Sequence, residues 1–365
     1  MMKVSVIVTS YNNSHVLAKC LDALVGQEYD RTGIELEIII VDSGSTDNSM
    51  EILESYGDAI KLVINPEDRP HLSPAEARNA GVARAEGEVL IFSDSDCVVP
   101  PDWVARMVGV MRETGAPCVI GNREPDYGEM WGTFVRRYNF IIYSNKFTIE
   151  EPVIMNEATL AAGRPIVLLA ANNFAIKSSV WNETGGMRSV FKNPSGEDLL
   201  MEIEIIKAGY DICFDPRVRV SHYHPISLKS MIHKSFYRGE STYLIKKHSD
   251  GYFDWRCIVD RGNMVDPGRF CLGAFSYAAF IAIVSSCGFS AQVTMAAYAT
   301  PLSVATLVGI VRKKKRLDTI LAAKGEVYRR DYALSLFDIF LFNQLEFVVN
   351  ITNTANFTWC NLLRR

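Results

Sequence analysis

Short apolar runs alternate with amphipathic segments along the first hundred residues. The apolar runs have the length of buried strands, whereas the amphipathic segments are long enough for helices. Predicted strands cover residues 3–8, 35–41, 60–65 and 89–92, and predicted helices cover 14–26, 50–56 and 73–85. Strands that alternate with helices in this way predict an α/β fold, with a Rossmann-like, mostly parallel sheet that binds ligands at the carboxyl ends of its strands.

Polar turns follow three of the predicted strands, at Thr9–Asn13, Asp42–Asp47 and Asp94–Asp96. Because the carboxyl ends of parallel strands share one edge of a sheet, we expect these turns to lie at one rim. Two acids one residue apart, Asp94 and Asp96, are costly to bury unless a cation neutralises them. Their oxygen atoms suit Mg²⁺ or Mn²⁺ shared with a substrate phosphate, and a solvated acidic turn is the alternative.

Three further polar groups follow apolar segments later in the chain. Asn172 and Asn173 end the apolar run 166–171. Glu197 and Asp198 lead into a predicted helix at 199–208, and His222 and His224 follow a predicted edge strand at 217–221. In each case a structural role is the alternative: a closed turn, a helix cap, or histidines satisfied within the fold.

Several of these stretches carry a recognisable set of motifs. They are Val4–Asn12, Ile39–Asp47, Ala77–Gly81, Asp94–Asp96, Asn172-Asn173, Gly185–Met187, Glu197-Asp198, Phe214–Pro216 and Val220–His222. In this order they resemble the family 2 glycosyltransferases of the GT-A fold, and the resemblance covers roughly residues 3–240. Thr9 departs from the family pattern, which commonly has proline there, and the change affects the stiffness of the turn more than its chemistry.

The resemblance implies a nucleotide site at this rim. Asp42 is expected to accept the imide N–H of a pyrimidine base, although an Asx-turn is the local alternative. The other implied nucleotide contacts are Thr9, Tyr11, Asn12, Arg78 and Asp94. Arg78 is expected either to contact the nucleotide or to hold Asp94, and a surface ion pair is the alternative.

The resemblance also implies the metal ligands, the catalytic base and the donor-sugar contacts. The resemblance assigns Asp94 to the ribose or the metal and Asp96 to the metal. His222 or His224 is a candidate third ligand or diphosphate contact, with His224 preferred, and Asn172, Asn173 and Glu197 are the candidate donor-sugar contacts. Asp198 is expected to be the general base that removes the proton of the acceptor hydroxyl, which implies inversion in a single displacement. We therefore expect Asp42, Asp96 and Asp198 to meet around one divalent ion and one diphosphate pocket.

A change in composition begins about three quarters of the way along the chain. Residues 270–311 carry no charged side chain, and the basic residues Arg269 and Arg312 flank them. Divided into two helices of roughly 20 residues each, this segment is long enough to span a bilayer twice. It therefore predicts a transmembrane hairpin. The basic flanks predict that the preceding domain lies on the cytoplasmic face. A buried helical pair is the alternative. Residues 332–351 are mostly apolar but include Asp338, Asn343, Gln344 and Glu346. They predict an interfacial or re-entrant helix, with a third span as the weaker option.

These patterns divide the chain into four predicted segments: a GT-A domain at 1–245, a linker or interfacial segment at 246–269, the hairpin at 270–311, and a basic loop with an interfacial helix at 312–365. The net charge of −4 and the scattered basic residues indicate no nucleic-acid partner. The eight cysteines have no Cys-x-x-Cys spacing, which favours reduced thiols over disulfides or zinc.

The sequence therefore predicts a membrane protein that transfers one sugar with inversion. The expected donor is a nucleoside-diphosphate sugar, with UDP favoured, and the expected acceptor is a lipid-linked or cell-surface glycan. No Gln-x-x-Arg-Trp motif, which resembling processive synthases carry, is present, so a single transfer is favoured. Two other functions stay open: a catalytically silent nucleotide-binding membrane scaffold, and a nucleotidyltransferase of related fold.

Overall fold

The computed structural model describes residues 1–29, 33–65, 71–126, 149–161, 170–193, 195–223, 237 and 240–250. The chain divides into two compact units, and the first comprises Met1–Met130, Ile149–Pro225 and Glu240–Val259. Everything described below belongs to this first unit. The predicted segments 246–269, 270–311 and 312–365 lie almost entirely outside the described residues, so the predicted domain boundaries stay predictions.

The predicted order of strands and helices is confirmed over the first hundred residues. The strands there are β1 (Met2–Ser10), β2 (Ile34–Asp42), β3 (Lys61–Ile64) and β4 (Val89–Asp94), and the helices are α1 (Ser14–Val25), α2 (Ser49–Ser55) and α3 (Pro74–Val82), with the short helix η1 (Gly57–Ala59). The later elements are β5 (Cys97–Val98), α4 (Trp103–Thr114), β6 (Cys118–Asp126), β7 (Val153–Met155), α6 (Glu157–Ala161), β8 (Phe174–Lys177), α7 (Ser178–Thr184), α8 (Glu197–Lys207) and β9 (Ile212–Tyr223).

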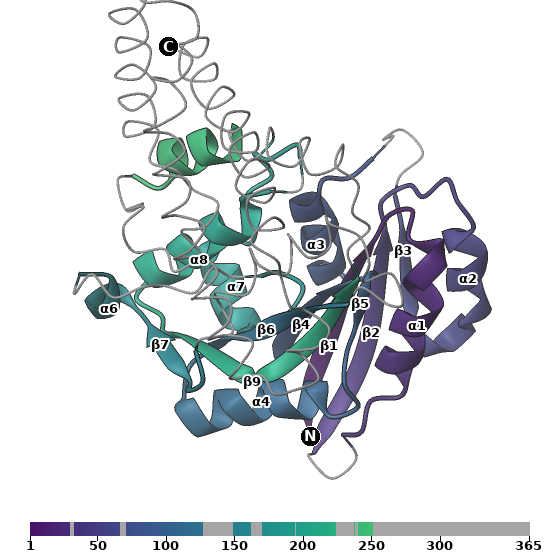
Figure 1. The fold of residues 1–365 in the computed structure, drawn as a ribbon, viewed down its shortest axis with the longest axis horizontal. Helices are drawn as coiled ribbons and strands as arrows, with labels where there is room; N and C mark the ends of the chain where they lie inside the picture. Colours follow the sequence, from purple (N-terminus) through teal and green to yellow (C-terminus); the bar gives the residue numbers. More distant parts are fainter. Residues whose placement is uncertain are drawn as a thin grey trace, which may run out of the picture. The chain divides into compact units, whose positions relative to one another are not determined.

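One sheet joins all these strands, in the order β3-β2-β1-β4-β8-β6-β9-β5, with β7 also paired to β9 (Figure 1). The expectation of a mostly parallel sheet is wrong, because the sheet is mixed. Strands β1 to β4 are parallel, but β8 runs antiparallel to both of its neighbours, and β5 and β7 run antiparallel to β9. The chain turns at residues 170–173 and enters β8 from the rim where β4 ends, which reverses the direction of β8.

The prediction of an edge strand at 217–221 is wrong at its carboxyl end. There Ser221 and His222 pair with β6 on one side and with β5 on the other, and at the other end of β9 Ile212–Phe214 likewise pair with both β6 and β7. Its alternate side chains are buried in agreement with this position, including Phe214, Val218 and Val220. The carboxyl end of β9 therefore lies between two neighbouring strands and not at the edge of the sheet.

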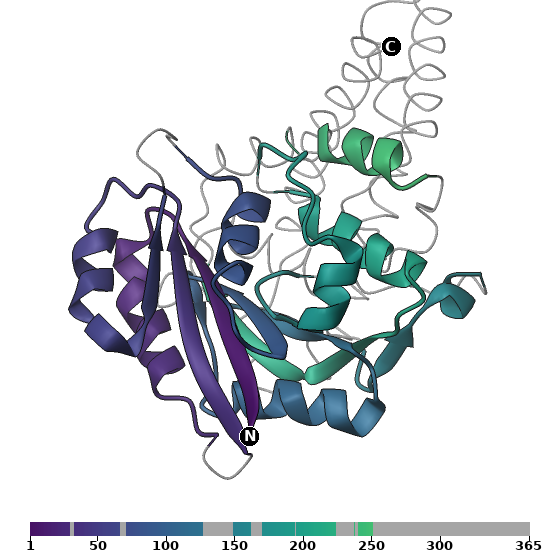
Figure 2. The ribbon, with the colours of Figure 1, turned by 180° about the vertical axis from the view of Figure 1, so that it is seen from behind.

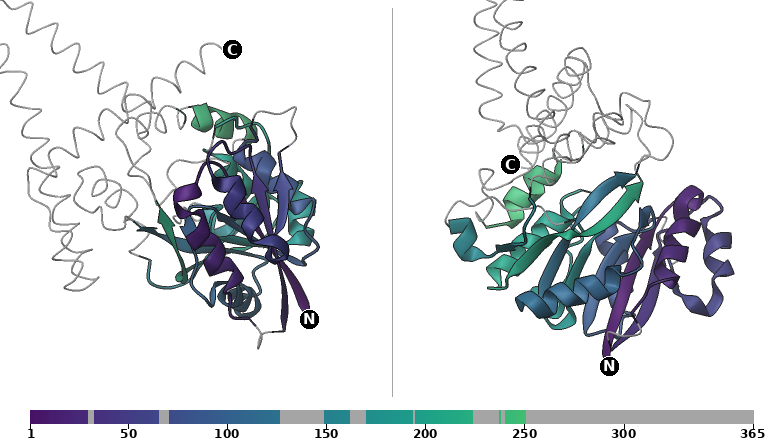
Figure 3. Two further views of the ribbon diagram at one scale, coloured as in Figure 1. Left: turned by 90° about the vertical axis from the view of Figure 1, so that its right-hand side faces the viewer. Right: turned by 60° about the horizontal axis from the view of Figure 1, so that its bottom comes forward.

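Helices cover both faces of the sheet, and the alternation of the strand residues assigns them (Figures 1 and 2). Val6, Val8 and Ile40 point to one face and pack in one core with buried residues of α1, α2 and α4. The neighbouring residues Ile39 and Val41 point to the other face, where they pack with Ala77 of α3. On that face Phe92 stacks on Trp181 of α7, and Arg78 of α3 bonds to Glu197 of α8, so α3, α7 and α8 share it. Figure 3 shows α4 lying across the other face.

Local signals in the sequence explain where α3 begins. The Ser73 side chain accepts a hydrogen bond from the N–H of Glu76, and the Glu76 side chain accepts one from the N–H of Ser73. This capping box satisfies two backbone donors at the helix start, and Pro74 occupies a position that needs no donor. The helix is thus held at a fixed start, four residues before Arg78.

The membrane prediction falls on residues that the structure does not describe. Among the residues that it does describe, we find no helix both long and apolar enough to cross a bilayer. The predicted hairpin at 270–311 and the predicted interfacial helix at 332–351 are outside those residues. The four cysteines that the structure describes, Cys20, Cys97, Cys118 and Cys213, are buried free thiols, as the sequence predicted for them.

Candidate functional site

The carboxyl ends of β1, β2 and β4 meet at one rim of the sheet. The register pairs Ser10 with Asp42 and Thr9 with Asp94, so both acids lie beside the end of β1. Because β2 and β4 flank β1 on opposite sides, the backbones at these two acids lie about 10 Å apart. The expectation that the polar turns share one rim is confirmed.

Hydrogen bonds join the turns at this rim to one another. Asn12, with a φ of 52°, accepts a bond from the N–H of Thr46 at 2.7 Å and donates its own N–H to the Ser45 hydroxyl at 2.9 Å. The Asn13 side chain donates to the Ser95 hydroxyl at 2.8 Å. Asn tolerates the left-handed conformation better than most residues, which suits the tight turn after β1. Asn12 therefore shapes the rim by linking the turns after β1 and β2.

Asp42 is buried and bonds within its own turn. Its carboxylate accepts the N–H groups of Gly44 and Ser45, at 2.9 and 2.8 Å, and the Ser45 hydroxyl at 2.6 Å. This is the local turn that the sequence left open as the alternative for this residue. The expected contact of Asp42 with a base stays a prediction, and in this structure the carboxylate holds the turn instead.

A buried arginine joins two acids that are far apart in the sequence. Arg78 of α3 donates from Nη2 to Oδ1 of Asp94 at 2.8 Å and from Nη1 to Oε1 of Glu197 at 3.2 Å. Burial opposes the charge, but Asp94, Glu197 and Asp198 outweigh it and raise the pKa of the Arg78 guanidinium. Thr9 also donates its hydroxyl to Asp94 Oδ1, at 2.9 Å. Arg78 thus holds Asp94, which is one of its two predicted roles, and Thr9 supports the same carboxylate.

Glu197 is buried but only half satisfied. Arg78 bonds to Oε1, whereas Oε2 is buried without a hydrogen-bond partner among the described residues. Burial, together with the charge of Asp198 and against that of Arg78, raises the pKa of Glu197 to about 7. Leaving a buried carboxylate oxygen unpaired is costly, so this atom is available to a donor from a ligand or water.

The proposed base, Asp198, follows directly in the first turn of α8. The helix begins two residues earlier than predicted, so Glu197 and Asp198 are its first residues and not a preceding loop. Asp198 is half-buried, and its Oδ1 accepts the N–H of Leu199 at 2.9 Å. A carboxylate is favoured at the amino end of a helix, where the backbone N–H groups point toward it.

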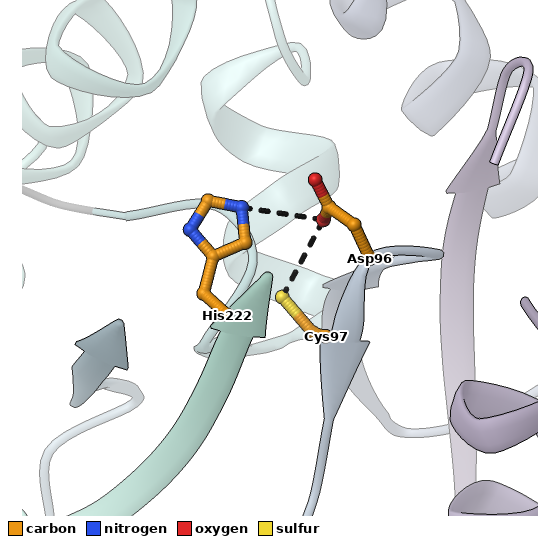
Figure 4. A group of neighbouring side chains, drawn as sticks. All are labelled: Asp96, Cys97 and His222. Atoms are coloured by element: carbon orange, nitrogen blue, oxygen red, sulfur yellow. Dashed lines mark hydrogen bonds and ion pairs between the residues drawn. The ribbon is translucent and has the colours of Figure 1, made fainter. Parts of the chain in front are cut away.

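Asp96 lies beside a histidine, as Figure 4 shows. Its Oδ1 is 3.2 Å from Nε2 of His222, which lies opposite Cys97 in the pairing of β5 with β9. Oxygen and imidazole nitrogen are ligands that Mn²⁺ accepts, so Asp96 and His222 fit a divalent ion. The third member of this cluster, Cys97, is buried, and burial with the nearby acids raises the pKa of its thiol well above the usual value.

The two acids of the Asp94–Asp96 turn therefore face different partners. Asp94 bonds to Arg78 and Thr9, and it does not belong to the cluster that Asp96 forms with His222. The predicted ligand His224 lies outside the described residues. Among the described residues, His222 is the histidine that the structure brings to Asp96. The sequence signal for it was its position directly after the predicted strand at 217–221, and in the structure it lies within β9.

The two asparagines predicted to contact the donor sugar differ in their surroundings. Asn173 is fully buried: Trp103 Nε1 donates to its Oδ1 at 2.8 Å, and its Nδ2 donates to the carbonyls of Asn122 and Val218. Its amide is thus bonded within the fold, which agrees with the structural alternative, and its expected sugar contact stays a prediction. Asn172 is also buried, but its Oδ1 has no partner among the described residues. It remains a predicted sugar contact.

An aromatic pair lies at the same rim. Tyr11 is 45% exposed, and its ring centroid is 4.5 Å from that of His71. The Nδ1 atom of His71 lies 3.2 Å from the carbonyl oxygen of Ser43, in the turn after β2. An exposed ring next to the Asp42 turn can stack on a nucleobase. Sequence reasoning found Tyr11 but missed His71, because no local pattern distinguishes a histidine in a loop.

Comparison with known proteins identifies the family. Residues 5–191 match the model of the Glycosyl transferase family 2. The chain belongs to this family. The matched region contains the turns after β1, β2 and β4 and the Arg78 helix, and it ends six residues before Glu197.

Two curated relatives and one solved structure show the extent of the likeness. Glycosyltransferase AglE of Haloferax volcanii is 37% identical over 137 residues, which is 37% of this chain and 44% of AglE. Glycosyltransferase GlyG of Streptococcus pneumoniae is 33% identical over 162 residues, 44% of this chain and 50% of GlyG. The matches thus span half or less of each relative.

The solved structure is the mannosyltransferase PcManGT from Pyrobaculum calidifontis, in complex with GDP-Man and Mn²⁺. It aligns with a TM-score of 0.59 at 17% identity, over 98% of this chain and 87% of PcManGT. At this identity the likeness shows a shared fold. With the family match, it identifies the described unit as a GT-A-like α/β domain with a mixed sheet.

Proposed function

We propose that this protein transfers a single sugar, with inversion, from a nucleoside-diphosphate sugar to a lipid-linked or cell-surface glycan. The observation that carries the proposal is the bridge through Arg78 between Asp94 and Glu197. The bridge links Asp94, at the end of β4, to Glu197, the residue before Asp198. The proposed nucleotide-binding acid and the proposed base therefore belong to one connected set of residues. The family and the GDP-Man complex of PcManGT support a nucleotide sugar as donor.

The chemistry assigned to the chain is a single displacement. Asp198 accepts the proton of the acceptor hydroxyl as its oxygen attacks the anomeric carbon, and the bond from that carbon to the diphosphate oxygen breaks. The nucleoside diphosphate leaves with the bonding electron pair, and the new bond forms on the opposite face of the sugar. Asp94 and Tyr11 bind the nucleotide, and Asn172 and Glu197 bind the sugar.

A divalent ion fits beside this arrangement. Asp96 and His222 supply an oxygen and a nitrogen ligand within one cluster, and Asp94 stays a predicted further ligand. Mg²⁺ or Mn²⁺ bound there would neutralise the charge that develops on the leaving diphosphate. The presence of Mn²⁺ in the PcManGT complex supports this part of the proposal.

One relative and one prediction from the sequence support the acceptor class. The poly(ribitol-phosphate) β-N-acetylglucosaminyltransferase TarS of Staphylococcus aureus, 36% identical over 96 residues (26% of this chain and 16% of TarS), is named for a polymeric acceptor. The predicted membrane hairpin at 270–311 would hold the domain at the cytoplasmic face of a membrane, beside a lipid-linked acceptor. UDP is the favoured nucleotide.

Two other functions make different predictions. A silent membrane scaffold would bind nucleotide without turnover. A nucleotidyltransferase would need a glycine- and arginine-rich phosphate loop after β1, where this chain has Thr9–Asn13.

A donor screen on the full chain tests the proposal. Thermal shifts with UDP-, GDP- and dTDP-sugars, with and without Mn²⁺, identify the donor, and release of the nucleoside diphosphate measures turnover with water in place of the acceptor. We expect Asp198→Asn to lower turnover about 10²–10⁴-fold without weakening nucleotide binding. Asp96→Asn should instead abolish the Mn²⁺-dependent part of the shift.

Asp102→Asn is the matched control, because Asp102 pairs with Arg106 on the exposed side of α4. It should leave both the shift and the turnover unchanged. Normal turnover by Asp198→Asn would reject the assignment of the base, and nucleotide binding without any turnover by the unmodified chain would favour the scaffold.

A further inference from the structure

Two consecutive residues of α3 hold the two ends of the connection between α7 and α8. Arg78 bonds to Glu197, the first residue of α8, at 3.2 Å. Asn79 bonds to the backbone of Met187, three residues after α7 ends, through both atoms of its amide. The side-chain Nδ2 donates to the Met187 carbonyl at 2.7 Å, and Oδ1 accepts the Met187 N–H at 3.1 Å.

The backbone around Met187 is shaped for this contact. Gly185 and Gly186 have φ values of 77° and 70°, a conformation that side chains other than glycine rarely adopt. A Cβ atom on Gly186 would lie 3.0 Å from both Asn79 Oδ1 and Trp181 Nε1. The chain can therefore pass close to Asn79 only because Gly186 has no side chain.

The other end of the connection is held from a second side. Gly196, the residue before α8, has a φ of 96°, and a Cβ there would lie 3.0 Å from the Cβ of Ser241. The Ser241 hydroxyl donates to the carbonyl of Ser195 at 2.6 Å. The first turn of α8, which carries Asp198, is thus fixed by α3 on one side and by the helical residues 240–248 on the other.

We propose that Arg78 and Asn79 form a clamp that positions Asp198 for proton transfer, with Asn79 acting on turnover and not on nucleotide affinity. Among the described residues the Asn79 side chain bonds to Met187, in the connection that leads to the base, and not to Asp42, Asp94 or Asp96. A base displaced by a fraction of an ångström loses much of its effect, because proton transfer needs hydrogen-bond distance. This inference rests on the proposed role of Asp198.

The test compares Asn79→Ala and the isosteric Asn79→Asp with the unmodified full chain. Turnover is the release of nucleoside diphosphate from the sugar donor that the screen selects among UDP-, GDP- and dTDP-sugars. Affinity is measured by titration of the matching nucleoside diphosphate with Mn²⁺. We expect Asn79→Ala to lower kcat at least about 10-fold with affinity changed less than about 2-fold. Asn79→Asp, which keeps one of the two bonds, should lower kcat by a smaller factor.

Asn156→Ala is the matched control, because the Asn156 amide also makes two bonds, to Asp211 and Thr159, beside the start of α6. It should keep both kcat and affinity, whatever its effect on the melting temperature. If both Asn79 variants keep the kcat of the unmodified chain, the clamp is refuted, even if they melt earlier. Asp198→Asn separates the two proposals: if it retains turnover, the proposed function itself fails, whereas its inactivity beside fully active Asn79 variants refutes the clamp alone.

Discussion

Two buried glutamates, one at each end of the same sheet, show how differently the two rims are built. Glu37 lies near the start of β2, where it accepts bonds from Ser5, from the N–H of Glu86 and from Lys61. Glu197 lies beyond the opposite rim, where Arg78 bonds to one of its oxygens and the other has no partner among the described residues. Both are buried, but only the first is fully bonded.

The two carboxyls respond in opposite directions. Burial favours the neutral form of each, but the bonds from Lys61 and Ser5 outweigh it at Glu37 and lower its pKa. At Glu197 burial dominates, and its pKa rises to about 7. At the rim around Glu37 the buried polar groups bond to one another, which stabilises the fold. At the rim around Glu197 a buried polar atom has no partner among the described residues, so it can bond to a ligand.

The largest expected effect is that of a substitution at Asp94, which shares Arg78 with Glu197. Asp94→Asn keeps the shape and an acceptor for Arg78 and Thr9 but removes the charge that we propose binds the nucleotide. We expect turnover to fall about 10²–10³-fold, since preorganised charge is worth that much in active sites. The measurement is nucleoside-diphosphate release by the purified chain, and a melting temperature close to that of the unmodified protein is the internal control. Full activity would remove Asp94 from the site.

A substitution at Glu37, at the opposite rim, should instead lower stability and leave turnover unchanged. Glu37→Gln places an amide where Lys61 and Glu86 find a carboxylate, and we expect the free energy of unfolding to fall by about 1–3 kcal/mol. Turnover at a temperature where both proteins are folded should be unchanged, because no residue of the site contacts Glu37. Urea unfolding measures the first quantity. A variant that lost activity but not stability would contradict the division between the two rims.

The pH dependence of stability sharpens the comparison with a smaller effect. Because the pKa of Glu197 is raised in the folded state, its contribution is fully present below about pH 4.5 and is lost as the pH rises through about 7. The difference in unfolding free energy between the unmodified chain and Glu197→Gln should therefore fall between pH 5 and 7, with a slope of at most about 1.4 kcal/mol per pH unit.

Glu37 should behave in the opposite way. Its lowered pKa means that its contribution is present above its unfolded pKa and is lost as the pH falls through the folded value. Glu37→Gln should thus differ from the unmodified chain by a constant amount between pH 5 and 8, and the difference should shrink in acid. Parallel pH profiles for the two variants would show that the two environments do not differ as described.

Much of the first half of the fold was predictable because its signals are local. The strands β1 to β4 and the helices between them follow the periodicity of the sequence, with ends shifted by a few residues. The second half was less predictable. The reversal of β8 depends on the turn at 170–173, and the interior position of β9 depends on strands that pair with it from far along the chain.

The same difference applies to the candidate site. Asp94, Asp96 and Asp198 were found because acids follow a buried strand or begin a helix. The structural contacts of Asn173 could not be predicted from neighbouring residues, because its amide bonds to Trp103 and to the carbonyls of two strands that are distant in the sequence. The contact of His222 with Asp96 likewise arises from the pairing of β9 with β5, which no local pattern indicates.

The sequence by itself determined which polar residues stand at the ends of strands and helices, since strand length, helix periodicity and capping depend on near neighbours. Only the tertiary structure decided which partner each acid takes: Asp42 its own turn, Asp94 an arginine, Asp96 a histidine. The reason is physical. Arg78 meets Glu197 across 119 positions of the chain, and such a contact exists only after α3 and α8 have packed on the same face of the sheet.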